Sequence, residues 1–143
     1  MNRAVGQDCY KVKGCPAAKA CTSSEGRTLL LPVNYIEQIV QAIRENPQAD
    51  CISFAGEITF RGKQPRKLVH SIAHREWCYS KGEYIRPPCH ITPIRRDIAL
   101  KYRFASKDLA EDMEWAMRMS SDRALKQEVV LDEVLYYYQC RRS

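Results

Sequence analysis

Residues 106–119 read Ser-Lys-Asp-Leu-Ala-Glu-Asp-Met-Glu-Trp-Ala-Met-Arg-Met, and this stretch has the clearest helical pattern in the chain. Asp108 is a good N-cap residue, and Glu111 follows it by three positions, as in a capping box. Apolar residues recur at helical spacing, at Leu109, Met113, Ala116 and Met117. The stretch therefore predicts an amphipathic helix over 108–119 that packs one face onto a core.

The same helix carries two side chains suited to carbohydrate chemistry. Asp112 and Trp115 are three residues apart, so they share a face of the helix. A carboxylate beside a flat aromatic ring can bind a sugar and accept a proton from one of its hydroxyls. A surface helix whose acidic first turn complements the helix dipole explains the same residues, and the sequence leaves both interpretations open.

The rest of the chain predicts one domain with helices and strands, preceded by an irregular leader at residues 1–31 that ends in a short strand. We expect helices at 34–46 and 95–102, strands at 51–55, 58–60, 68–73, 76–79 and 84–85, and a closing strand pair at 127–131 and 134–139. The strands between 51 and 85 are typical of an antiparallel meander, and three prolines keep 87–93 out of regular structure. The predicted fold class is α/β or α+β, with a mixed sheet flanked by helices over residues 32–143.

The composition indicates a globular protein of a reducing compartment. The 143 residues have a formal net charge of +6 that is spread along the chain, which makes nucleic acid an unlikely partner. There are seven cysteines, an odd number, and the first 14 residues lack the apolar core of a secretory signal. No stretch has the length and apolar character of a membrane span. We therefore expect a cytoplasmic protein with reduced cysteines.

A second group of candidate residues lies in the proline-rich loop and at the start of the helix that follows. The imidazole of His90 can bind a phosphate, a metal or a sugar hydroxyl, because loops on rigid supports often carry binding residues. Arg95 and Arg96 can each pair with a phosphate. A histidine bonded to its own loop, followed by a solvated pair of arginines, is the alternative.

Five segments keep a fixed order between about residues 32 and 140. They are 35–43 (Tyr-Ile-Glu-Gln-Ile-Val-Gln-Ala-Ile), 49–54 (Ala-Asp-Cys-Ile-Ser-Phe), 87–96 (Pro-Pro-Cys-His-Ile-Thr-Pro-Ile-Arg-Arg), 110–115 (Ala-Glu-Asp-Met-Glu-Trp) and 135–138 (Leu-Tyr-Tyr-Tyr). Together they resemble the acceptor-side, C-terminal half of a family 2 glycosyltransferase with the GT-A fold. The adjacent Glu-Asp pair before the tryptophan is the strongest single element.

The resemblance implies transfer of a sugar from a nucleotide-sugar donor to a hydroxyl of a carbohydrate or another acceptor, with inversion at the anomeric carbon. Asp112 would be the base that deprotonates the acceptor, with Glu111 as its partner. Trp115 would shape the acceptor site, and His90 would lie near the diphosphate or the acceptor. The family also uses a divalent metal ion, Mn²⁺ or Mg²⁺, on an Asp-x-Asp motif.

The chain departs from the family in its first part. It contains no Asp-x-Asp motif, so the metal ligands that the family uses are absent, and the nucleotide-binding half is not found before residue 32. We therefore expect residues 32–143 to be an acceptor-side domain that is incomplete alone. It would be a truncated gene product, a remnant, or one part of a two-chain enzyme whose second polypeptide carries the missing half. A non-catalytic intracellular binding or assembly module is the alternative. A zinc-stabilised nucleic-acid binder, using cysteines such as Cys9, Cys15 and Cys21, is a third.

Overall fold

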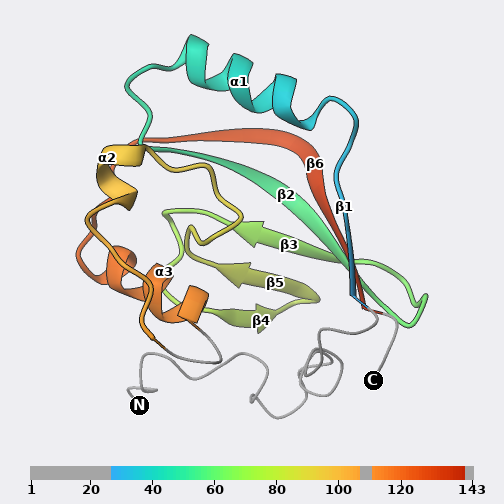
Figure 1. The fold of residues 1–143 in the computed structure, drawn as a ribbon. Helices are drawn as coiled ribbons and strands as arrows, with labels where there is room; N and C mark the ends of the chain where they lie inside the picture. Colours follow the sequence, from blue (N-terminus) through green and yellow to red (C-terminus); the bar gives the residue numbers. More distant parts are fainter. Residues whose placement is uncertain (1–26, 107–110, 141–143) are drawn as a thin grey trace.

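The computed structural model describes residues 27–106 and 111–140, and it contains a six-stranded mixed sheet with three helices (Figure 1). In chain order the elements are β1 (Arg27–Leu30), α1 (Tyr35–Glu45), β2 (Cys51–Phe60), β3 (Arg66–His70), β4 (Cys78–Ser80), β5 (Glu83–Arg86), α2 (Arg96–Ala99), α3 (Glu111–Ser121) and β6 (Glu128–Cys140). The predicted α/β or α+β class is confirmed. None of the described helices combines the length and the apolar character needed to cross a membrane.

The strand order of the sheet is β1-β6-β2-β3-β5-β4, and two of its five pairings are parallel. β6 runs parallel to β2, and β5 runs parallel to β3 with Val69 opposite Ile85. The predicted antiparallel meander is therefore wrong, because β3 neighbours β5 and not β4. Alternating apolar residues predict a strand, but they carry no information about its partner or direction.

The prediction of a closing pair of strands is also wrong, because residues 128–140 form one continuous strand, β6. The predicted turn at 132–133 is instead an irregularity in the pairing with β2. There Ser53 lies opposite Val130, and Ala55 lies opposite Val134. A bulge of this kind absorbs extra residues without reversing the chain.

β2 continues through Gly56, where the sequence predicts a bend between two strands. A Cβ atom on this glycine would lie 3.1 Å from Leu68 Cδ2 and 3.1 Å from the backbone oxygen of Tyr136. The glycine thus allows two neighbouring strands to approach β2 closely, and it does not end the strand.

β1 joins the sheet at its edge, antiparallel to β6, with Leu30 opposite Tyr137. Residues 27–30, which the sequence places in the leader, are therefore part of the sheet. β1 leads through residues 31–34 into α1, which matches the predicted helix within one residue at each end. Asn34 occupies the N-cap position, although its side chain makes no capping hydrogen bond.

The three helices cover the sheet unequally. α1 buries Ile39 and Ala42 against a cluster that includes Ile52 and Phe54 of β2. α2 and α3 lie beside each other at one end of the sheet (Figure 1). α2 is shorter than the predicted 95–102, because the chain continues from Ala99 to residue 102 in turns.

α3 buries the predicted apolar stripe in a core of its own. Met113, Ala116 and Met117 pack with Trp77 and Cys89, which come from the loops around β4 and β5. The predicted cap and the first stripe residue, at 108 and 109, lie outside the described residues. The packing places the first turn of α3 beside the loop that follows β5.

Candidate functional site

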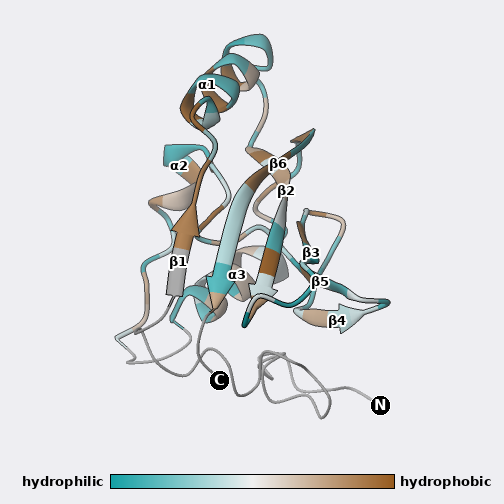
Figure 2. Ribbon diagram, turned by 90° about the vertical axis from the view of Figure 1, so that its right-hand side faces the viewer, coloured by the Kyte–Doolittle hydropathy of each residue, from teal (hydrophilic) through white to brown (hydrophobic). Residues whose placement is uncertain are grey.

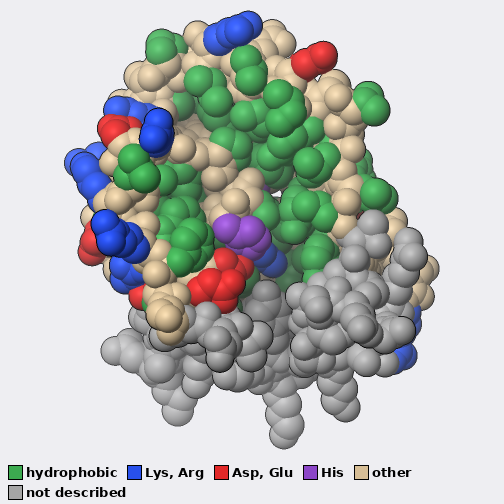
Figure 3. Space-filling model, in the orientation of Figure 1, with side chains coloured by type: hydrophobic (Ala, Val, Ile, Leu, Met, Phe, Trp, Pro, Cys, Tyr) green, Lys and Arg blue, Asp and Glu red, His purple; other side chains and the backbone are tan. Residues whose placement is uncertain are grey.

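The structure brings together two of the predicted site residues, His90 and Asp112. His90 Nδ1 lies 2.9 Å from Asp112 Oδ2, and the side chains are 43% and 30% exposed. Both groups can therefore reach solvent or a ligand while they stay in contact. Figure 3 shows a histidine side chain beside acidic side chains on this face of the molecule, next to a hydrophobic surface.

A network of hydrogen bonds holds the loop that presents His90. The Cys89 amide donates to Thr92 Oγ1 at 3.0 Å, and the Thr92 amide donates back to the Cys89 carbonyl at 2.8 Å. Thr92 Oγ1 also lies 2.9 Å from Nδ1 of the buried His70, the last residue of β3. The amide of Ile52 in β2 donates to the Pro93 carbonyl at 3.0 Å. His90 thus projects from a loop fastened to two strands.

The contact between His90 and Asp112 sets the charge of both groups. Its hydrogen bond with Asp112 raises the pKa of His90 to about 9, with a smaller contribution from the side chain of Cys89. The same bond lowers the pKa of Asp112, against the opposing effect of burial. At neutral pH the site therefore holds an imidazolium and a carboxylate in contact.

Arg86 is a charged residue of this region that the sequence analysis missed. It ends β5 opposite His70, it is buried, and its guanidinium lies 4.2 Å from the centroid of the Trp77 ring. Burial and the charge of Arg86 lower the pKa of His70 to about 3, so that imidazole is neutral. The signal available in the sequence was a charged residue at the end of an apolar strand, just before Pro87.

No family model, curated protein or solved structure matches this chain.

Trp115 does not join the site in the way the sequence predicts. Its side chain packs into the core of α3, and its indole Nε1 donates to the Tyr102 carbonyl at 2.9 Å. The ring stacks on Phe104 with centroids 5.0 Å apart. Trp115 lies one turn after Asp112, but its indole is buried together with the apolar residues of α3 that face the core.

Among the ion pairs of the described residues, none joins an arginine at the start of α2 to His90 or Asp112. Arg95 forms ion pairs with Asp50 at 3.3 Å and with Asp97 at 2.9 Å. Asp50 directly precedes β2, so the guanidinium of Arg95 joins the start of α2 to the start of β2. Arg96 is exposed at the first position of α2. Glu111 starts α3 beside Asp112, and within the described ranges it has no ion pair. The predicted site thus reduces to His90 and Asp112.

Side chains that can bind a metal ion are not clustered in the described part of the chain. No group of three or more His, Cys, Asp or Glu side chains is gathered there. The three cysteines that repeat every six residues lie outside the described residues. We accordingly assign no step to a metal.

Proposed function

We propose that this chain is the acceptor-binding part of an inverting sugar transferase, with Asp112 as the base. The observation that carries the proposal is the contact of 2.9 Å between His90 Nδ1 and Asp112 Oδ2 at a partly exposed site. Both residues are ones to which the resemblance to family 2 glycosyltransferases gives a role near the acceptor. A cytoplasmic setting and a nucleotide-sugar donor are parts of the same proposal.

The chemistry of the pair suits proton transfer from a hydroxyl. An ionised carboxylate accepts the hydrogen bond of the acceptor hydroxyl and takes its proton as the oxygen attacks the anomeric carbon. The bond from that carbon to the diphosphate breaks, and the leaving diphosphate keeps the electron pair. The imidazolium of His90 keeps Asp112 oriented and ionised, and its charge stabilises negative charge nearby.

A transfer assay with matched variants tests the role of Asp112. The full chain is incubated with a panel of nucleotide sugars, divalent metal ions and saccharide acceptors, and acceptor-dependent release of nucleoside diphosphate is measured. Asp112→Asn should lower the rate by roughly 10² or more, because the amide cannot accept the proton. Asp132→Asn, at an exposed carboxylate in β6, is the control and should keep the wild-type rate.

A second readout covers the case in which the chain needs another polypeptide for donor binding. Saturation-transfer NMR with the same saccharides should detect binding to the wild-type chain alone, and Asp112→Asn should weaken it. Full activity of the asparagine variant contradicts the assignment of the base. Absence of both transfer and saccharide binding contradicts the proposal as a whole.

A non-catalytic assembly module is the second candidate, and an exposed apolar face supports it. Leu29, Leu30, Val33, Ile36 and Ile43 are all exposed, with Ile36 at 65%. Figure 2 shows the hydrophobic stretch running from β1 toward α1. Such a continuous face on an edge strand and a helix is typical of an interaction surface.

The charges on α1 suit a second copy of this chain as the partner. Ile36, Val40 and Ile43 form an apolar stripe, and Glu37 and Arg44 flank it on one side. Two antiparallel α1 helices that cross between positions 40 and 41 place each Glu37 opposite Arg44 of the other copy. The face is thus self-complementary, as a two-fold interface requires.

Sedimentation velocity over a range of concentrations tests this second candidate. Self-association should appear in the wild type, and Ile36→Asp should abolish it. Val130→Asp, at an exposed apolar residue of β6, is the control and should leave it unchanged. A wild-type chain that stays monomeric at all concentrations argues against the assembly module.

A further inference from the structure

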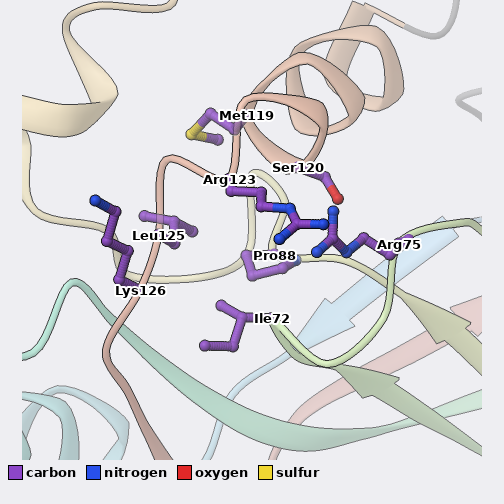
Figure 4. A pocket seen from close by; sticks show the side chains of 8 residues that line it. All are labelled: Ile72, Arg75, Pro88, Met119, Ser120, Arg123, Leu125 and Lys126. Carbon is purple, nitrogen blue, oxygen red and sulfur yellow. The ribbon is translucent and has the colours of Figure 1, made fainter.

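A pocket separate from the His90–Asp112 pair lies at the C-terminal end of α3. Its volume is about 350 Å³, and it is lined by Ile72, Arg75, Pro88, Met119, Ser120, Arg123, Leu125 and Lys126 (Figure 4). These residues come from the segment after β3, the loop after β5, and α3 with the connection to β6. The pocket is at the lower end of the size range of small-molecule sites.

The lining combines an apolar floor with a basic rim. Three lining residues are basic and none is acidic. Arg75 and Arg123 extend toward each other beside Ser120, while Lys126 lies on the other side (Figure 4). Within 27–106 and 111–140, neither arginine side chain forms an ion pair. Two guanidinium groups that converge without a carboxylate favour an anion between them.

The backbone conformation of Arg123 fixes where its side chain lies relative to the pocket. Its φ is +50°, in the left-handed region that favours glycine. The Arg123 amide donates to the Ser120 carbonyl at 3.1 Å, and the Ala124 amide donates to the Met119 carbonyl at 3.0 Å. These two bonds form a Schellman motif with Arg123 at the position that glycine usually occupies. A strained arginine is thus kept where its side chain reaches the pocket.

We propose that this pocket binds a phosphate monoester of a small apolar or planar group. Arg75 and Arg123 would hold the phosphate oxygens, each through paired N–H donors, and the Ser120 hydroxyl would donate a further hydrogen bond. The organic group would lie on the floor, which is built from Ile72, Pro88, Met119 and Leu125. Arginine suits this task because its planar fork matches the geometry of phosphate oxygens.

The site is distinct from the proposed sugar-transfer site. Asp112 and Ser120 lie near opposite ends of α3, and eight residues of helix separate them by about 12 Å along its axis. Pro88 and His90 belong to the same loop, so a ligand in the pocket touches the segment that presents the imidazole. Binding here does not depend on sugar transfer by this chain.

NMR titration of the full chain with phenyl phosphate tests the proposal. The Nε–H signals of Arg75 and Arg123 should shift and saturate. Inorganic phosphate and phenol, which each supply half of the ligand, should bind at least about tenfold more weakly. Arg75→Gln should raise the dissociation constant for phenyl phosphate at least about tenfold.

Two glycine variants separate the ligand role from the backbone role. Arg123→Gly should raise the melting temperature, because it removes the left-handed strain, and yet weaken phenyl phosphate binding at least about tenfold. Arg61→Gly is the matched control: it removes the same charge at φ +49°, in the turn after β2. That control should keep the wild-type affinity.

Three outcomes would overturn the site. They are no saturable shift in the wild type, unchanged affinity in Arg75→Gln and Arg123→Gly, or equal weakening in Arg61→Gly and Arg123→Gly. The last outcome would mean that net charge alone attracts the phosphate. Equal binding of inorganic phosphate and phenyl phosphate would remove the organic part of the ligand.

Discussion

Replacing Asp112 with asparagine should lower the pKa of His90 from about 9 toward its ordinary value of 6.5. The change removes the negative charge that lies 2.9 Å from His90 Nδ1 and keeps the size of the side chain. The imidazole would then lose its proton near neutral pH. The state of His90 therefore reports directly on the contact that carries the proposed function.

The stabilising effect of the pair depends on pH in a defined direction. Because the pKa of His90 is raised on folding, the stabilisation that His90 gives to the fold is complete below pH 6.5. It is lost as the pH rises toward about 9. Because the pKa of Asp112 is lowered on folding, the stabilisation that Asp112 gives to the fold is present above pH 3.8 and is lost at more acidic pH. The pair therefore stabilises the fold most between 3.8 and 6.5.

The size of the effect follows from the same values. The difference between 6.5 and about 9 corresponds to roughly 3–4 kcal/mol at most, at about 1.4 kcal/mol per pH unit. The His90 side chain is 43% exposed, so solvent screening reduces this to about 1 kcal/mol. Between pH 6 and pH 9.5, the wild type should lose about 1 kcal/mol of unfolding free energy more than the Asp112→Asn variant.

Two measurements check this expectation. A ¹H–¹³C NMR titration follows the imidazole of His90 and gives its pKa, and urea unfolding at several pH values gives the free energy. Asp132→Asn serves as the control and should leave the titration of His90 unchanged. If His90 still titrates near pH 9 in the Asp112→Asn variant, the contact does not determine its charge and the reasoning about the site fails.

Three further substitutions test contacts elsewhere in the fold. Gly56→Ala should destabilise the fold by roughly 1–3 kcal/mol in urea unfolding, because the added methyl group would lie 3.1 Å from Leu68 Cδ2; a neutral result would mean that the strands can separate. Asp50→Ala should cost about 2–4 kcal/mol, because two backbone amides before β6 lose their acceptor. Burial raises the pKa of Asp50, but hydrogen bonds from these amides and the charge of Arg95 lower it by more. The stability of the wild type should therefore fall as the pH drops below 3.8. A stability that does not change with pH in this range would contradict the role of this carboxylate. Arg123→Gly should raise stability by about 1 kcal/mol in thermal unfolding, and an unchanged melting temperature would show that the left-handed backbone is not strained.

Local patterns in the sequence determined the elements that depend on neighbours along the chain. The spacing of apolar residues located α1 and α3, and three prolines located the irregular loop that carries His90. The resemblance singled out Asp112 and His90 as candidate site residues, and only the structure shows that their side chains are in contact. These features share a cause, because periodicity, capping and proline act within a few residues.

Tertiary structure decided the features that depend on distant residues. Parallel pairing of β2 with β6 joins residues 77 to 80 positions apart, from Cys51 with Glu128 to Phe60 with Cys140, and no local pattern encodes a partner at that distance. Core packing buried Trp115, since the side of a helix that faces the core depends on what packs against it. The basic pocket likewise exists because Arg75 and Arg123, 48 positions apart, meet at the end of α3. Burial and electrostatics between such residues act through space, and only the folded chain brings the residues together.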